Sequence, residues 1–258
     1  MSALPFIAVN ARDILARHGL DTFQALWELK LDAIDEPNVN RGGWSSVYRL
    51  ELEGADGQLQ SFYLKRQDNH LTRSLQAPWG EPTFAREFRY IQAYARHGVP
   101  ALEAAFYAER REPGHRQAIL LTRALDDYQD ADDWYQRWPT LGWAARHDLV
   151  VATGALVRAL HNAGMVHNCL YFKHIFLKVD GDGAGARLID LEKTRRAWRG
   201  QRDFVADLET LLRRSAPLPR TQRLRFMLAY TGKTRVDAEV RQLIADIARK
   251  HQRKERRR

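Results

Sequence analysis

The chain has 258 residues, which is enough for one large domain or two small ones with a substantial hydrophobic core. Its formal net charge of +9 favours anionic partners but does not choose among nucleotides, phosphorylated glycans, nucleic acid and an anionic membrane surface. The single cysteine excludes an internal disulfide framework, the first residues lack the pattern of a signal peptide, and no window reaches the roughly 18 apolar residues of a membrane span. We therefore expect a cytoplasmic protein.

The first 125 residues predict a small sheet with a helix inserted. Residues 10–34 carry apolar side chains at helical spacing. Alternating apolar and polar residues predict strands at 44–52 and 59–66 around the turn sequence GADG, and an amphipathic helix follows at 83–97. A short buried strand is expected at 116–125.

The pattern changes after five aspartates between residues 126 and 133, which we interpret as a solvated linker or helix start rather than a metal site, because they lack the EF-hand spacing. Helices are expected at 144–164, 202–215, 221–232 and from 237 onward, and a strand in the run ARLIDLE. The predicted organisation is a helix and sheet-rich lobe over 1–125, a helical lobe over 126–246, and a basic tail over 247–258.

Four features stand in the order that phosphoryl transfer from a nucleotide requires: a phosphate loop, a lysine, a carboxylate that holds it, and a metal ligand. The loop candidates are Gly42, Gly43, Ser45 and Ser46. The lysine is Lys65, the helix carboxylate is Glu87, and Asp190 ends an apolar strand. Taken singly, the loop, the lysine and the glutamate more often represent a hairpin turn, a solvent-facing lysine and an exposed glutamate, whereas Asp190 more often represents a metal-binding carboxylate than a turn-capping aspartate.

The arrangement resembles the bacterial lipopolysaccharide kinase family, which includes heptose and Kdo kinases, within the protein kinase-like superfamily. The resemblance covers roughly residues 38–230 and lies in the following segments, which stand in the correct order: RGGWSSVYRLEL, FYLKRQ, FAREFRYIQAYARHGVPALEA, AILLTRAL, LHNAGMVHNCLYFKHIFL, LIDLEKTRR and RDFVADLETL. It implies an α+β fold with two lobes, a small antiparallel sheet with one helix followed by a mostly helical lobe.

The resemblance also implies roles for individual residues, with ATP and Mg²⁺ as cofactors. Lys65 would contact the α- and β-phosphates, Glu87 would hold Lys65, and the loop glycines and serines would cover the phosphates. Adenine would meet the backbone around Leu121 and Arg123. The remaining roles fall to the helical lobe: Asp190 and His174 as metal ligands, His167 as a structural anchor, and Asp207 as a brace behind the catalytic loop.

The main departure from the kinase pattern is Cys169, which stands where the catalytic aspartate is expected in His167-Asn168-Cys169. Three readings stay open. The protein is a kinase that manages without this base or recruits Glu192 or a substrate phosphate, since a general base contributes about 10²–10⁴-fold. It is a pseudokinase scaffold that binds nucleotide or glycan without transfer. Or the thiol has its own chemistry, with a zinc site of His167, Cys169 and His174 as an outside alternative.

The expected acceptor is a sugar hydroxyl of the lipopolysaccharide core or another anionic glycan, with a protein or small molecule as the alternative. The basic tail RKHQRKERRR is either a solubilising tail or an attachment to the anionic inner membrane. We expect no specific nucleic-acid binding, because neither an RNP motif nor a zinc finger is present.

Overall fold

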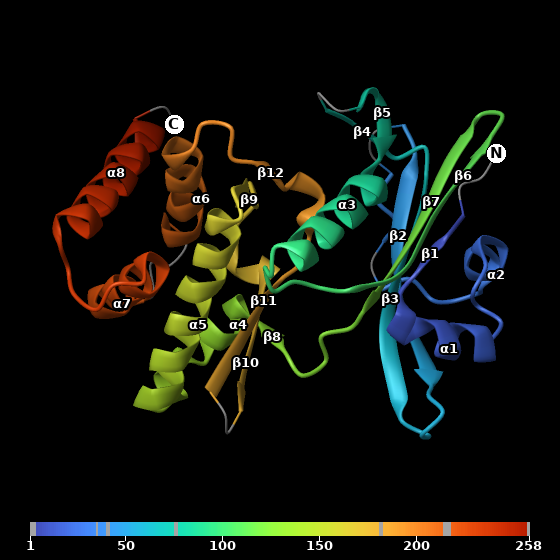
Figure 1. Cartoon of the computed structure of the whole chain (residues 1–258), viewed down its shortest axis with the longest axis horizontal. Helices are drawn as coiled ribbons and strands as arrows, with labels where there is room; N and C mark the ends of the chain where they lie inside the picture. The colour runs from blue at the N-terminus through green and yellow to red at the C-terminus, as the bar shows by residue number, and fades with distance from the viewer. Residues whose placement is uncertain are drawn as a thin grey trace. The chain divides into compact units, whose positions relative to one another are not determined.

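A computed structural model describes residues 4–34, 36–39, 42–74, 77–180, 183–213 and 218–256. The chain divides into two compact units. The first comprises Met1–Gln92 and Leu102–Asp126, and the second comprises Ala93–Ala101 and Asp127–Arg258 (Figure 1).

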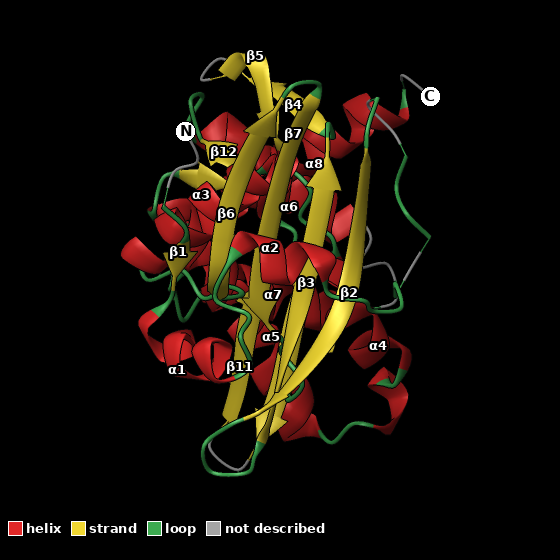
Figure 2. Ribbon diagram, turned by 90° about the vertical axis from the view of Figure 1, so that its right-hand side faces the viewer, coloured by secondary structure: helices red, strands yellow, loops and turns green. Residues whose placement is uncertain are grey.

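The first unit is built on a five-stranded antiparallel sheet with the strand order β1-β6-β7-β3-β2 (Figure 2). Its strands are β1 (Phe6–Ile7), β2 (Trp44–Glu53), β3 (Leu59–Asp68), β6 (Ala104–Glu112) and β7 (His115–Arg123). A separate hairpin is formed by β4 (Leu71–Ser74) and β5 (Ala77–Pro82). β3 pairs with both long neighbours, so Lys65 lies opposite Val47 on one side and Leu120 on the other.

Helices cover both faces of this sheet. Side chains alternate along a strand, so the even-numbered residues of β3, such as Phe62 and Leu64, pack in a core with α1 (Val9–Arg17) and α2 (Phe23–Glu28). The odd-numbered face of β3 carries Lys65, which contacts Glu87 of α3 (Thr83–Arg96).

The predicted helix over 10–34 is divided into α1 and α2. Gly19 follows α1 with φ +64, a backbone conformation that favours glycine. The Thr22 side chain then accepts a hydrogen bond from the Ala25 N–H and begins α2. Helical spacing detects the apolar face but not such an interruption, because both helices bury their apolar residues against the same sheet.

The second unit is mostly helical. Its helices are α4 (Ala131–Gln136), α5 (Trp143–Asn162), α6 (Gln201–Arg213), α7 (Arg220–Thr231) and α8 (Ala238–Glu255), with 3₁₀ turns at Trp138–Thr140, Phe172–His174 and Leu191–Lys193. α5 and α7 approach closely at Gly154, where an added Cβ would lie 2.7 Å from the Ala229 Cβ. Among the described residues, no helix is long and apolar enough to cross a membrane.

Short strands position the loops of the second unit. β10 (Ile175–Asp180) pairs with β11 (Gly183–Leu188) and with β8 (Gln129–Asp130), and β12 (Arg195–Arg196) pairs with β9 (Met165–Val166). The predicted strand in ARLIDLE ends at Leu188, two residues before Asp190.

The basic segment expected as a tail from residue 247 belongs to α8 as far as Glu255; residues 257 and 258 lie outside the described residues. The buried Glu209 of α6 explains this helical extension, because its carboxylate pairs with Lys254 and lies 3.3 Å from the His251 Nδ1. The same carboxylate pairs with Arg213 at 3.1 Å. The last turns of α8 are thereby attached to α6.

Candidate functional site

The first group of candidate residues is the pair of Lys65 and Glu87. The Lys65 Nζ lies 2.7 Å from the Glu87 Oε1, and the two side chains are 19% and 3% exposed. The Phe84 ring lies 5.9 Å from the same Nζ. A buried ion pair adds little net stability, because desolvation offsets its attraction. Its position on a central strand and a covering helix is what a phosphate-binding lysine requires.

The predicted phosphate loop divides into two parts. Gly42 has φ +78, and a Cβ on Gly43 would lie 2.1 Å from the Asp68 carbonyl oxygen, so both positions favour glycine. Ser45 and Ser46 belong to β2, and the Ser46 side chain is buried. The structure thus places the glycines at the turn and the serines in the adjoining strand.

The residues expected at the adenine position lie at the end of β7. Leu121 is fully buried between β3 and β6. The Arg123 N–H donates to the Glu103 carbonyl at 2.9 Å, and its guanidinium contacts Gln60 and the Asn10 carbonyl. The Arg123 N–H is therefore already used within the first unit.

In the second unit the structure brings Cys169, His174 and Asp190 together. The His174 Nδ1 lies 2.8 Å from the Cys169 carbonyl oxygen, and its Nε2 lies 3.1 Å from the Asp190 Oδ2. Asp190 has a left-handed backbone, with φ +57, and precedes the 3₁₀ turn Leu191–Lys193. Such a conformation is costly for a residue other than glycine and is concentrated at functional positions.

The facing groups of His174 and Asp190 are of the kind that can bind a cation. A carbonyl oxygen only accepts, so the His174 Nδ1 donates its proton to the Cys169 carbonyl oxygen, and in that tautomer the Nε2 lone pair points at the Asp190 carboxylate. Two acceptors 3.1 Å apart need a second ring proton or a cation between them. The pair therefore fits a divalent cation whose other ligands come from phosphates and water.

Behind this loop, Asp207 of α6 holds the backbone. Its carboxylate accepts the N–H groups of His167 at 2.6 Å and Asn168 at 2.9 Å. Asn168 has φ +63, a left-handed conformation that asparagine tolerates better than most residues. The His167 ring contacts the Ile189 carbonyl at 2.9 Å and joins the loop to the segment before Asp190. Burial lowers the pKa of His167, so its ring is neutral near pH 7.

Cys169 contributes its backbone to these contacts, and its side chain is partly exposed. The zinc alternative is not supported. Within the described part of the chain, no group of three or more His, Cys, Asp and Glu side chains is arranged to hold a metal ion.

Sequence reasoning overlooked the Arg195–Asp203 pair that shapes the segment after Asp190. The Arg195 guanidinium binds both Asp203 carboxylate oxygens, at 2.8 and 2.9 Å, and the Arg199 N–H donates to the same carboxylate. The Arg195 side chain lowers the pKa of Asp203 to about 2. An aspartate in the first turn of a predicted helix was the available signal, but its partner depends on the tertiary fold.

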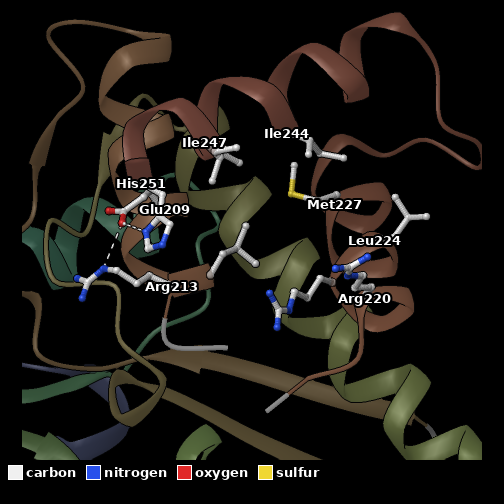
Figure 3. A pocket seen from close by; sticks show the side chains of 11 residues that line it. Glu209, Arg213, Arg220, Leu224, Met227, Ile244, Ile247 and His251 are labelled. Atoms are coloured by element: carbon white, nitrogen blue, oxygen red, sulfur yellow. Dashed lines mark hydrogen bonds and ion pairs between the residues drawn. The ribbon is translucent and has the colours of Figure 1, made fainter. Parts of the chain in front are cut away.

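A separate cavity of about 530 Å³ lies among α6, α7 and α8 (Figure 3). Apolar residues form much of its wall, including Leu212, Met227 and Ile247. Three arginines, Arg213, Arg220 and Arg223, also line it, together with the Glu209 carboxylate that pairs with Arg213. The cavity therefore combines an apolar interior with positive charge.

The sheet, the lysine–glutamate pair and the loop of the second unit together define the class of the protein. An antiparallel sheet carries the Lys65–Glu87 pair, and a helical unit follows in which Asp207 holds a loop and His174 contacts Asp190. This arrangement is a protein kinase-like fold. A solved structure described as WaaP in complex with acyl carrier protein matches with a TM-score of 0.67 and 22% identity, over 96% of this chain and 98% of that one. This match shows the fold.

The chain belongs to the lipopolysaccharide kinase (Kdo/WaaP) family, whose model matches residues 24–230. Protein InaA of Escherichia coli (strain K12) is 30% identical over 202 residues, which cover 78% of this chain and 91% of that protein. The lipopolysaccharide core heptose(I) kinase WaaP of Pseudomonas aeruginosa is 28% identical over 160 residues, 56% of this chain and 58% of that protein. The family and the fold predicted from the sequence are both confirmed.

Proposed function

We propose that this protein is an ATP- and Mg²⁺-dependent kinase that phosphorylates a sugar hydroxyl of the lipopolysaccharide core. Family membership supports the reaction class, and the name of the relative WaaP supports the acceptor. The observation that carries the proposal is the Lys65–Glu87 pair at 2.7 Å. Burying these two charges has little structural benefit, whereas a lysine held by a glutamate is what phosphoryl transfer requires.

In the proposed reaction each unit supplies one set of groups. Lys65 contacts the α- and β-phosphates, and Glu87 keeps its ammonium in place. Asp190 and His174 hold the divalent cation, which neutralises phosphate charge when bound. Asp207 and His167 fix the backbone of the loop that presents these ligands.

Cys169 leaves the acceptor hydroxyl without the usual carboxylate. Phosphoryl transfer has a loose transition state, so positioning and charge neutralisation matter more than proton removal. A slow kinase is therefore compatible with the site. Glu192, two residues after Asp190, or a phosphate on the substrate would then take the proton.

The acceptor is proposed to be anionic. Four exposed cations follow Asp190 within twelve residues: Lys193, Arg196, Arg199 and Arg202. Guanidinium groups bind phosphate well, so an already phosphorylated glycan is a suitable acceptor. A protein or small-molecule acceptor is the alternative within the same reaction class.

The competing proposal is a pseudokinase that binds nucleotide without transferring phosphate. The side chain at position 169 favours it, because a thiol is a poor substitute for a carboxylate base. Binding and transfer are therefore tested separately.

Binding is tested by calorimetric titration with ATP and Mg²⁺. Wild-type protein should bind, and Lys65→Ala and Asp190→Ala should bind more weakly, while Lys30→Ala, which removes an exposed lysine of the first unit, should match wild type. A folded wild-type protein that does not bind ATP refutes the kinase and the nucleotide-binding pseudokinase together.

Transfer is tested with lipopolysaccharide core acceptors and radiolabelled ATP. Cys169→Asp should transfer faster than wild type, and Cys169→Ser, which has no carboxylate, should not. If only Cys169→Asp transfers phosphate, the wild-type protein is a pseudokinase. Turnover on a protein or small molecule alone would replace the proposed acceptor.

The cavity among α6, α7 and α8 is proposed as a partner site. The solved relative is a complex with acyl carrier protein, and an apolar cavity lined by arginines suits an acyl chain on an anionic carrier. Copurification of an acylated carrier with wild-type protein, and its loss in Met227→Arg, is the expected result. Equal amounts with both proteins would exclude this site.

The end of α8 is proposed to contact anionic lipid at the cytoplasmic face of the inner membrane. Arg253 and Arg256 are exposed there, and each basic residue near such a surface contributes about 1 kcal/mol. Sedimentation with phosphatidylglycerol vesicles at low salt should fall in the Arg253→Glu, Arg256→Glu double variant. Unchanged sedimentation would remove the membrane contact.

A further inference from the structure

Gln67 lies on the same face of β3 as Lys65, because side chains two residues apart on a strand point the same way. Its side chain is fully buried. Glutamine is seldom found fully buried, and a buried amide must have hydrogen-bond partners. Those partners indicate what the residue does.

Among the described residues, the hydrogen bonds of the Gln67 side chain go to the start of α3 or to the residue before the β4–β5 hairpin. Its Oε1 accepts the Thr83 hydroxyl at 2.7 Å and the Phe84 N–H at 2.9 Å. Its Nε2 donates to the His70 carbonyl at 2.7 Å. The Thr83 hydroxyl also lies 3.2 Å from the His70 Nδ1. The amide is thus fixed in one orientation.

Through these contacts Gln67, a residue of β3, caps the N-terminus of α3. The first N–H groups of a helix have no partner within the helix and are usually satisfied by the residue that precedes it. Here that residue is Pro82, which has no side-chain acceptor. The Gln67 Oε1 satisfies the Phe84 N–H in its place.

The cap bears directly on the lysine–glutamate pair. Glu87 follows Thr83 by four residues, about one helical turn, and so lies on the same side of α3. The Phe84 ring is 5.9 Å from the Lys65 Nζ. One strand therefore contacts α3 twice on the same face, through Gln67 at the first turn and through Lys65 one turn later.

We propose that Gln67 is a positioning residue that holds the first turn of α3 so that Glu87 meets Lys65. The pair needs a defined height and rotation of α3 above the sheet, and two hydrogen bonds from a rigid central strand supply both. The importance of this positioning for nucleotide binding rests on the proposed function, whereas the positioning itself does not.

The test measures the pairing of Lys65 with Glu87 in the absence of nucleotide. An amine-reactive succinimidyl ester modifies accessible lysines, and peptide mass spectrometry gives the rate at Lys65 relative to the exposed Lys30 in the same unit. Glu87→Gln should raise the Lys65 rate, because the ester reacts with the free amine and the carboxylate no longer pairs with the Lys65 ammonium. Gln67→Met, similar in size but without the amide, should raise the Lys65 rate roughly fivefold, which corresponds to a coupling free energy of about 1 kcal/mol, in the lower part of the range usual for neighbouring residues.

A double variant separates positioning from general loosening. If Gln67 acts through Glu87, adding Gln67→Met to Glu87→Gln should change the Lys65 rate little further. An equal increase in both backgrounds, or no increase in Gln67→Met alone, overturns the proposal. Thr83→Val, with Thr83→Ser as its matched control, gives the same comparison if Gln67→Met does not fold: Val should behave like Gln67→Met, and Ser like wild type.

The ATP dissociation constant is measured on the same proteins. Gln67→Met should weaken binding in the Glu87 background and not in Glu87→Gln. Thr153→Val, which removes a buried hydroxyl from α5 of the other unit, controls for stability loss alone and should leave ATP binding unchanged. Altered labelling with no ATP binding in wild type would refute the proposed function and leave the positioning role intact.

Discussion

Asp207→Asn tests the bracing of the loop that carries Cys169. The wild-type carboxylate accepts two backbone N–H groups, from His167 and Asn168, and is 3% exposed. An asparagine has one acceptor oxygen, so one N–H loses its partner and faces an NH₂ group instead. An unsatisfied buried donor costs about 1–3 kcal/mol, and hydrogen bonds to a charged group about 1.5–3 kcal/mol, so we expect a loss of roughly 2–4 kcal/mol in the free energy of unfolding.

Circular dichroism monitors unfolding, in a urea titration for the free energy of unfolding and on heating for the melting temperature. Asp127→Asn is the control, because Asp127 is an exposed carboxylate of the same unit. The melting temperature should fall by about 5–15 °C, given roughly 2–4 °C per kcal/mol for a chain of this size. A loss below about 0.5 kcal/mol, the range of ordinary surface substitutions, would mean that Asp207 does not hold the loop.

Three further predictions concern stability. Gly43→Ala should destabilise the first unit by about 3 kcal/mol in a urea titration, because the new methyl group would meet backbone atoms. Gly42→Ala has free space but a φ of +78, and should cost only about 1 kcal/mol. The reverse order would contradict the close approach of Gly43 to the backbone at Asp68. Asp203 has a pKa lowered to about 2, so its pairing with Arg195 stabilises the protein above about pH 4 and is lost as the pH falls through 2. Asp203→Asn should abolish about 2 kcal/mol of this pH dependence of the free energy of unfolding, and parallel curves for wild type and variant would argue against the pairing. Gly154→Ala should lower the melting temperature despite a better helix propensity, since α7 leaves no room for the methyl group; an unchanged or higher value would show that the helices can separate.

Much of the fold follows from local pattern. Alternation located β2 and β3, and helical spacing located α3, α5 and the three last helices, because each of these elements buries one continuous apolar face. Sequence reasoning overlooked β6 and the β4–β5 hairpin. The hairpin is short, and its register shifts within β4, so its sequence has no clean alternation.

The site is predictable to a different degree. The sequence predicted Lys65 and Glu87, and the structure places their charged groups 2.7 Å apart. It did not predict Gln67 or Arg195. The Gln67 side chain binds residues that are distant in sequence, and no sequence pattern marks Asp203 as the partner of Arg195. A polar residue on a central strand signals a buried partner, but only the tertiary fold shows which one it is.

The hydrogen bonds that hold the loop around Cys169 come from groups other than that side chain. Asp207 binds the two preceding N–H groups, His174 binds the Cys169 carbonyl, and His167 joins the loop to Ile189. Changing the side chain at 169 therefore leaves the backbone contacts in place. A gain of transfer in Cys169→Asp would consequently measure the missing carboxylate itself, and its absence could not be attributed to a collapsed loop if the variant keeps the wild-type affinity for ATP.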